Sequence, residues 1–193
     1  MHNYKDFEVN IISEERIETE HLILRKARPE DTKAIWKNVW SDEEVAKYML
    51  WIPTKTEEEA KERMERTIFY QGKIPAFFVC LKETDEPIGF AGIKEVEEGV
   101  YEDCGACFMR TCQRKGYGKE MIAALTTLAF EKFHAKAVRF GCFEENIPSK
   151  SLIECMGFEF VDKVPEVREK DGYEYIALNY IMYNPDHDKN NLT

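Results

Sequence analysis

The chain has 193 residues, of which 44% are hydrophobic and 33% are charged, and its formal net charge is −10 at pH 7. This composition is typical of a globular protein rather than of a disordered or fibrous one. The sequence has no apolar run near the roughly 18 residues of a membrane span, and its first residues lack the apolar core of a secretory signal. We therefore expect a cytoplasmic protein with no membrane partner. The acidic balance argues against a nucleic-acid groove and favours a cationic substrate or partner.

A chain of this length is expected to form one domain. We predict a domain at 17–184, an N-terminal extension at 1–16 and a flexible tail at 185–193. The predicted elements, in chain order, are a strand at 21–27, helices at 29–39, 41–49 and 56–69, strands at 76–81, 87–93 and 101–109, a helix at 120–130, a strand at 137–143, a helix at 150–156, and strands at 158–161 and 173–183.

Short turn and cap signals support this order. Ser41 and Glu44 have capping-box spacing at the second helix, and the turn at 84–86 joins two strands into a hairpin. Strands and helices in this succession predict a mixed α/β fold, of the α+β type, with helices covering a sheet.

Cys104, Cys107 and Cys112 raise the question of a metal site. Residues three apart on a strand face opposite sides, so Cys104 and Cys107 could not hold one ion. Disulfides are not expected in a cytoplasmic protein. We therefore predict buried free thiols and no metal.

The segment Gln113-Arg-Lys-Gly-Tyr-Gly118 lies between a predicted strand and a predicted helix. Such a turn offers free backbone N–H groups and the positive end of a helix dipole, which together attract anions. Gly116 and Gly118 leave room for a ligand to approach the backbone. The pattern predicts a phosphate-binding turn, although it is neither a Walker loop nor a dinucleotide fingerprint. The alternative is an ordinary turn whose basic residues are solvated.

Three segments in this order resemble the GNAT superfamily of acyl-CoA-dependent N-acetyltransferases. Gln113-x-x-Gly116-x-Gly118 matches the family signature for the coenzyme pyrophosphate, and Asn146-Ile-Pro-Ser149 with Gly157-Phe158 resembles its downstream motif. Residues 17–25 resemble the opening of the RimJ/RimL branch, and the resemblance covers about 17–183. It implies a central, mixed, mostly antiparallel twisted sheet with helices on both faces.

The resemblance implies acetyl-CoA as co-substrate. In this family two strands, here 101–109 and 137–143, splay apart to admit the pantetheine arm. Backbone groups of Phe108, Met109 and Arg110 would pair with the arm like an added strand. Asn146 would hydrogen-bond the arm or cap the following helix. The residues implied around the pyrophosphate are Gln113, Arg114, Lys115, Gly116, Tyr117, Gly118 and Lys119.

The resemblance also implies the catalytic groups. It places the base at Asp103 or Glu102; these neighbours on a strand face opposite sides, so only one faces the cleft. Asp103 fits the RimJ/RimL pattern and Glu102 fits the lysine-acetylating relatives, while either could be a solvated strand-end charge. Many relatives carry a tyrosine acid where this chain has Ile153, which leaves Ser149 as the acid or as a helix cap. The oxyanion donor would be the N–H of Phe108 or its neighbour.

The acceptor site is less defined by the sequence. Glutamates at 43, 44 and 57–59 either attract a cationic acceptor or form the solvated face of a helix. The aromatic candidates for the walls of this site are Trp36, Trp40, Trp51, Tyr70 and Phe77.

We expect an N-acetyltransferase whose first-choice acceptor is a protein N-terminal α-amine of the ribosomal-protein type. An α-amine with a pKa near 8 loses its proton at pH 7 for about 1.4 kcal/mol, against about 4.6 kcal/mol for a lysine. The alternatives are a small-amine acetyltransferase acting on a polyamine, amino acid or aminoglycoside, and a non-catalytic CoA-binding regulatory module. The sequence leaves a homodimer open.

Overall fold

The computed structural model describes residues 2–187. The strands are β1 (Asn10–Ser13), β2 (Arg16–Glu18), β3 (Leu22–Arg25), β4 (Ala76–Leu81), β5 (Pro87–Glu97), β6 (Val100–Asp103), β7 (Cys107–Phe108), β8 (Ala137–Phe143), β9 (Glu159–Arg168) and β10 (Tyr173–Tyr183). The α-helices are α1 (Thr32–Ile35), α2 (Glu43–Ala46), α3 (Glu57–Gln71), α4 (Tyr117–Thr127) and α5 (Ile147–Cys155); π-helical turns at Trp36–Trp40 and Leu128–Lys132 extend α1 and α4.

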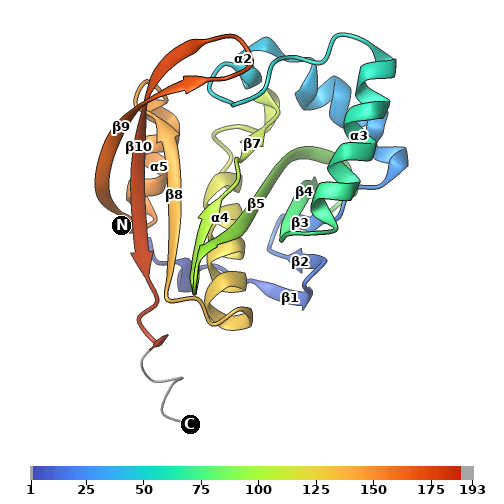
Figure 1. The fold of residues 1–193 in the computed structure, drawn as a ribbon. Coiled ribbons are helices and arrows are strands. Elements are labelled where there is room, and N and C mark those ends of the chain that lie inside the picture. The colour runs from blue at the N-terminus through green and yellow to red at the C-terminus, as the bar shows by residue number, and fades with distance from the viewer. Residues whose placement is uncertain (1, 188–193) are drawn as a thin grey trace.

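The strands form one twisted sheet in the order β1-β2-β3-β4-β5-β6-β8-β10-β9, and β7 pairs with β5 beside this path. Neighbouring strands are antiparallel except β6 and β8, which are parallel. Figure 1 shows β8 and the β9–β10 hairpin diverging from β5 toward the top of the view. The mixed, mostly antiparallel sheet expected from the sequence is confirmed.

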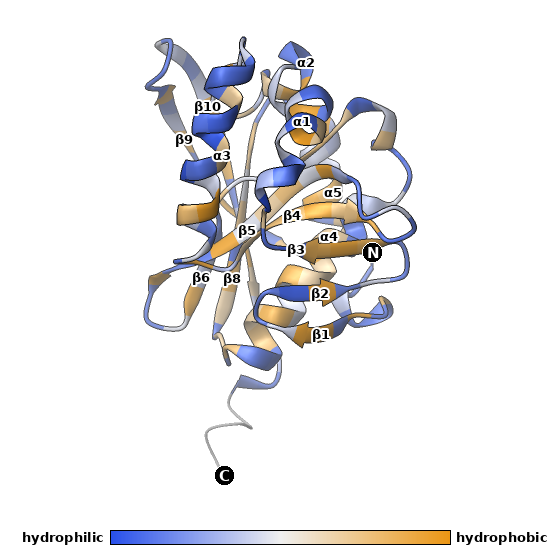
Figure 2. Cartoon of the chain, turned by 90° about the vertical axis from the view of Figure 1, so that its right-hand side faces the viewer, coloured by the Kyte–Doolittle hydropathy of each residue, from blue (hydrophilic) through white to orange (hydrophobic). Residues whose placement is uncertain are grey.

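Helices cover both faces of the sheet and define two apolar cores. On one face, α4 and α5 bury Leu125 and Met156 together with Tyr4 from the N-terminal segment. On the other face, α1 and α3 bury Ile35 and Met64. Figure 2 shows hydrophobic residues concentrated on β3–β5 and α4, while α3 is mostly hydrophilic on the side facing the viewer.

Local sequence signals explain where several helices begin. Thr56 and Glu59 form a reciprocal capping box at α3, which satisfies N–H groups that have no partner within the helix. The predicted Ser41 cap of the second helix is wrong: Asp42 caps α2, accepting from the N–H groups of Glu44 and Val45 at 2.9 and 3.3 Å. Asparagine, aspartate and serine are nearly equivalent as caps, so neighbouring candidates are hard to rank from sequence.

The predicted single strand at 101–109 is instead two short strands. β6 ends at Asp103 and β7 begins at Cys107, and between them Gly105 adopts a φ of 98°. Both pieces pair with β5, but only β6 also pairs with β8. The interruption therefore lies where the two halves of the sheet separate.

The ends of the chain differ from the sequence-based picture in detail. Within the segment treated as an extension, β1 pairs with β2 and Tyr4 is buried, while β9 runs well beyond the strand predicted at 158–161. The predicted flexible tail lies mostly outside the described residues. Of its described part, Asp186 forms an ion pair with Lys5, with 2.8 Å between Oδ2 and Nζ.

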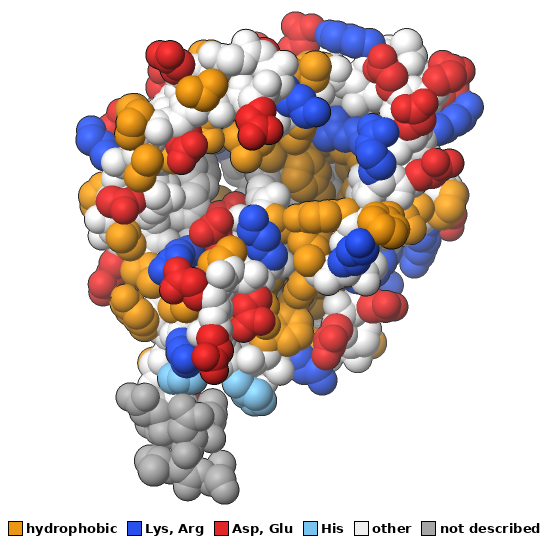
Figure 3. Space-filling view, viewed as in Figure 1, with side chains coloured by type: hydrophobic (Ala, Val, Ile, Leu, Met, Phe, Trp, Pro, Cys, Tyr) orange, Lys and Arg blue, Asp and Glu red, His pale blue; other side chains and the backbone are white. Residues whose placement is uncertain are grey.

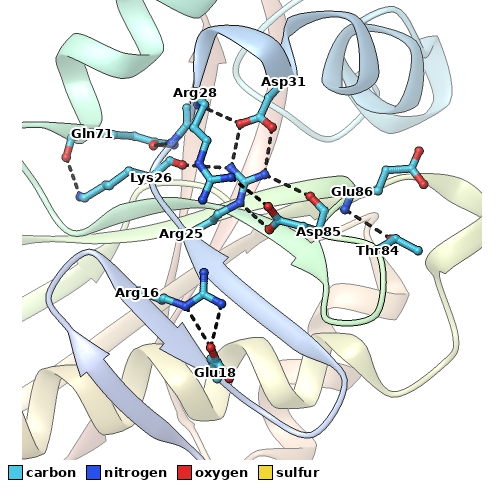
Figure 4. Close-up of polar contacts among 11 residues, drawn as sticks. Arg16, Glu18, Arg25, Lys26, Arg28, Asp31, Gln71, Thr84, Asp85 and Glu86 are labelled. Atoms are coloured by element: carbon cyan, nitrogen blue, oxygen red, sulfur yellow. Dashed lines mark hydrogen bonds and ion pairs between the residues drawn. The ribbon is translucent and has the colours of Figure 1, made fainter.

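A buried ion pair fixes the start of α1 against the sheet (Figure 4). Arg25 of β3 donates from Nη1 and Nη2 to both carboxylate oxygens of Asp31 at 2.8 and 2.9 Å, and both side chains are buried. Its Nε donates to Asp85 in the β4–β5 turn at 2.7 Å. One guanidinium therefore joins β3, the N-terminal end of α1 and the hairpin turn.

Replacing Asp31 by alanine should lower the free energy of unfolding by about 3–5 kcal/mol, because it leaves a buried guanidinium without its main counter-charge. Chemical denaturation measures this change. Glu30→Ala, at the exposed neighbouring position, is the control and should stay within about 0.5 kcal/mol of wild type. Equal, small effects of the two variants would contradict the importance of this pair.

Candidate active site

The segment between β7 and α4 presents a row of free backbone donors. A short 3₁₀ turn at Arg110–Cys112 leads into the glycine segment, and α4 begins with no side-chain cap on its first turn. Within residues 2–187, the N–H groups from Arg114 to Gly118 have no hydrogen-bond acceptor. Unpaired N–H groups at a helix start attract a negatively charged ligand.

Two residues in the left-handed region bend this segment into a concave loop. Arg114 has a φ of 60° and Gly116 a φ of 90°; alternation of backbone conformations turns successive N–H groups to the same side. A Cβ at Gly116 would meet no atom within 4 Å, so the loop is open there. A Cβ at Gly118 would lie 2.7 Å from Leu152 Cδ2, so this glycine allows α4 to approach α5 closely.

The four cationic side chains near the loop are not equivalent. Arg110 Nε contacts Asp42 Oδ2 at 2.8 Å, and Lys119 Nζ lies 2.9 Å from His2 Nε2. Arg114 and Lys115 are exposed and form no ion pair with any described residue. These two are therefore the cations of the group with no hydrogen-bond or ion-pair partner among the described residues.

A polar cluster anchors the first turn of α4 to the β2–β3 connection. The buried Glu120 carboxylate accepts from the Thr19 hydroxyl at 2.7 Å and from the His21 N–H at 3.1 Å. Its other oxygen lies 2.8 Å from His21 Nδ1. This hydrogen bond raises the pKa of His21 above its ordinary value. The loop is thus held in place by contacts that leave its N–H groups free.

The sheet separates immediately beside the loop. Glu102 and Arg139 form the last residue pair between β6 and β8. Met109 donates to Ile88 O of β5 at 2.7 Å, so strand alternation turns the N–H and C=O of Phe108 away from β5. That carbonyl accepts from Gln113 Nε2 at 3.1 Å; the Gln113 side chain therefore braces β7 against the loop.

Asp103 bridges the two strands at the point of separation. Its Oδ1 accepts from the Gly141 N–H of β8 at 2.8 Å, and its Oδ2 accepts from the Gly105 N–H at 3.1 Å. The carboxyl group is half-buried; loss of solvent around it raises its pKa to about 6, although the two N–H groups act in the opposite direction. Glu102, by contrast, lies opposite Lys94 and Arg139 in the ladder.

The N-terminal end of α5 holds the other predicted residues. Asn146 caps this helix, because its Oδ1 accepts from the Ser149 N–H at 3.3 Å. The Ser149 hydroxyl takes no part in this cap and hydrogen-bonds the Cys142 thiol of β8 instead. Burial raises the pKa of this thiol to about 11. Ile153 is buried in the core beneath α5. The residue at this position therefore faces the core, whereas Ser149 is half-buried in the first turn of α5.

A cavity of about 190 Å³ lies on the opposite face, between α3 and strands β4 and β5. Figure 3 shows this side of the molecule hollowed in its upper half beside α3, with hydrophobic side chains on the floor. Cys104 and Gly105, which directly follow Asp103, complete its wall. Of the aromatic candidates, four line this cavity: Trp40, Trp51, Tyr70 and Phe77.

Trp36 lies outside this cavity lining, and its indole N–H donates to Thr54 O at 3.0 Å. The glutamates considered for a cationic acceptor do not line the cavity either. Glu43 pairs with Lys55 and Glu57 with Lys61. Sequence reasoning missed Arg63, which does line it; its helical position one residue before the buried Met64 gave no sign of this.

The sequence model of the acetyltransferase (GNAT) domain family matches residues 21–159. An uncharacterized N-acetyltransferase, p20 of Bacillus licheniformis, is 30% identical over 148 residues, which cover 75% of this chain and 83% of that protein. A GNAT-family acetyltransferase structure from Bacillus anthracis superposes with a TM-score of 0.76 at 23% identity, covering 88% of this chain and 98% of that chain. The structure of the ribosomal-protein-S5-alanine acetyltransferase of Vibrio fischeri superposes with a TM-score of 0.69 at 15% identity, covering 89% of this chain and 97% of that chain.

The chain therefore belongs to the GNAT acetyltransferase family and is an N-acetyltransferase of that family, whose members use acetyl-CoA as co-substrate. No helix within the described residues is long and apolar enough to span a membrane. The described part of the chain also contains no cluster of three or more His, Cys, Asp or Glu side chains suited to a metal ion.

The Glu120–His21 contact predicts a measurable shift at one histidine. The pKa of His21 should exceed the unperturbed value of about 6.5 and fall back in Glu120→Gln, as followed by NMR titration. Because the folded-state pKa is raised, this contact stabilises the fold below pH 6.5 and loses its effect as pH rises through the folded-state pKa. Glu20→Gln is the control and should leave most of the rise in the His21 pKa. If the rise disappeared in Glu20→Gln but not in Glu120→Gln, Glu120 would not be its cause.

Proposed function

We propose that this enzyme transfers the acetyl group of acetyl-CoA to a primary amine, with a protein N-terminal α-amine as first-choice acceptor, in the manner of the RimJ/RimL branch. The observation that carries the proposal is the row of N–H groups from Arg114 to Gly118, which have no acceptor in residues 2–187 and lie beside the separation of β6 and β8. The fold shared with the Vibrio fischeri ribosomal-protein-S5-alanine acetyltransferase supports the choice of acceptor at the level of fold. A cytoplasmic location belongs to the same proposal.

Residues near the point where β6 and β8 part would hold the co-substrate. The concave loop would bind the pyrophosphate through main-chain N–H groups, with Arg114 and Lys115 adding charge. The exposed edge of β7, from Phe108 to Arg110, would pair with the pantetheine amides as an added strand. When bound, acetyl-CoA supplies the activated acyl group as a thioester.

The chain supplies the proton transfers. Asp103, with a pKa near 6, is a carboxylate at pH 7 and would accept the amine proton, directly or through a water. Its pKa suits an α-amine, because deprotonating that amine at pH 7 costs only about 1.4 kcal/mol. The Ser149 hydroxyl would donate toward the departing thiolate, and the Phe108 N–H would stabilise the oxyanion.

A small amine is the second candidate acceptor. The observation favouring it is the size of the cavity beside Asp103, about 190 Å³, which suits a compact group better than a long segment of chain. Acetyl-CoA turnover on a panel of N-terminal peptides and small amines, followed by release of free CoA with a thiol reagent, separates the two. Tight CoA binding without turnover on any acceptor would favour the non-catalytic module instead.

Disturbing the loop backbone should weaken CoA binding. Gly116→Val places a β-branched residue at a φ of 90°, a conformation that such residues rarely adopt, so the row of N–H groups would lose its curvature. We expect the Kd for CoA, measured by calorimetry, to rise about 10-fold or more, as for loss of at least one charge-assisted hydrogen bond.

Gly72→Ala is the matched control, since Gly72 has an ordinary φ of −70° and lies at the C-terminal end of α3. Its Kd should equal that of wild type. An unchanged Kd in folded Gly116→Val would show that the loop backbone does not bind the coenzyme.

The pH profile should identify the base. In wild type, kcat/KM should rise with pH through about 6 as Asp103 loses its proton, and again near 8 as the α-amine does. Asp103→Asn should lower kcat/KM about 100-fold at neutral pH and abolish the lower step. Glu102→Gln should keep both steps. Loss of the lower step in Glu102→Gln rather than in Asp103→Asn would reverse the assignment.

A further inference from the structure

The cavity between α3, β4 and β5 is placed to receive the acceptor. Its wall includes Cys104, the residue after Asp103, and Gly105, whose N–H donates to Asp103 Oδ2. The cavity thus begins where the separated strands end, on the sheet face opposite α4. A group bound in it would lie next to the stretch of backbone that directly follows the proposed base.

One wall of this cavity carries a guanidinium without a counter-charge. The Arg63 Cζ lies 4.6 Å from the ring centre of Trp40 and 4.3 Å from that of Trp51. Its Nη1 donates to Thr54 Oγ1 at 2.9 Å, and no carboxylate in residues 2–187 forms an ion pair with it. Burial lowers the pKa of Arg63 to about 10, so it is still charged at pH 7. A guanidinium has five N–H donors, most of which stay available here.

Trp51, which also lines the cavity, carries a second hydrogen-bond donor without an acceptor among the described residues. The indole N–H of Trp51 is buried and has no hydrogen-bond partner among the described residues. Buried polar groups are nearly always paired, so such an exception calls for a ligand or a water. Arg63 stacks on the Trp51 ring, so the guanidinium and this indole lie against each other in the same wall.

A purely structural role for Arg63 explains only part of this arrangement. Stacking between two indoles accounts for its position, but apart from the bond to Thr54 it leaves the guanidinium donors and the Trp51 N–H without partners among the described residues. A polycationic acceptor fits poorly, since the residues lining the cavity include a buried cation and no Asp or Glu. Two adjacent donors in an aromatic cavity match a carboxylate.

We propose that the acceptor carries a carboxylate close to its amine, bound by the Arg63 guanidinium and the Trp51 N–H; this inference rests on the proposed acetyltransferase function. Two sources have this chemistry: a free amino acid, and a peptide whose first side chain is acidic. Either acceptor would present its amine toward Asp103 while its carboxylate lies against Arg63 and Trp51.

The test compares acceptors that differ only in the carboxylate. Free glutamate and aspartate are assayed against their fully amidated forms, and peptides beginning with Asp or Glu against the same peptides beginning with Asn or Gln. We expect kcat/KM to favour the carboxylate member of one series by about 10-fold or more, the effect of a hydrogen bond to a charged group. Whichever series prefers the carboxylate member shows whether the acceptor is a free amino acid or a peptide.

Arg63→Met should reduce that preference ratio to about 1, and Trp51→Phe should reduce it several-fold. Arg66→Met, on the exposed side of the same helix where Arg66 pairs with Glu62, is the matched control and should keep the wild-type ratio. Melting temperatures are recorded for each variant, and if Arg63→Met does not fold, the ratio in Trp51→Phe decides. A structural role alone would slow both members of each pair equally and leave the ratio unchanged.

Binding separates this inference from the proposed function. Tryptophan fluorescence of the CoA-loaded protein is titrated with the same acceptors. Turnover with equal kcat/KM for both members overturns the inference and leaves the function standing. Carboxylate-dependent fluorescence changes that vanish in Arg63→Met, without turnover of any acceptor, support the inference and overturn the function. Absence of both binding and turnover overturns both.

Discussion

The candidate active site depends on the loss of pairing between two adjacent strands. β6 and β8 are hydrogen-bonded only as far as Glu102 and Arg139, because the chain bends at Gly105 and β7 continues along β5. Unpaired strand edges inside a sheet are costly unless their polar groups find other partners. Asp103 satisfies one of them by accepting from Gly141, and the edge of β7 stays available for a ligand. The same break that opens the sheet therefore also positions a carboxylate.

The candidate site also requires an anchored row of backbone N–H groups that other protein groups do not fill. The start of α4 supplies this row. Its first turn is held from behind by Glu120, which contacts Thr19 and His21. The N–H groups on the other side have no acceptor among the described residues, and this anchoring leaves them so. Preorganised donors of this kind need little rearrangement when charge arrives, which supports the proposal that a short loop with Arg114 and Lys115 beside it binds an anion in an acidic protein.

The sequence predicted the parts of the site that depend on local chemistry. The glycine turn and the strand at 137–143 follow from φ requirements and apolar patterning, and both are present. The break after Asp103 was missed, since Cys104-Gly-Ala106 reads as strand until its two neighbours diverge. Arg63 was missed for a related reason: a charged residue on a charged helix looks solvated, and only packing against Trp40 and Trp51 gives it another role. Contacts between distant segments carry the information that local patterns lack.

The central claim is that main-chain N–H groups after β7 bind the coenzyme diphosphate. Its most direct measurement is a ¹⁵N-resolved NMR titration of the protein with CoA, compared with pantetheine, which lacks the diphosphate. If these N–H groups bind the diphosphate, we expect large amide shifts from Arg114 to Gly118 with CoA and almost none there with pantetheine. CoA binding that left these five amides unshifted would contradict it.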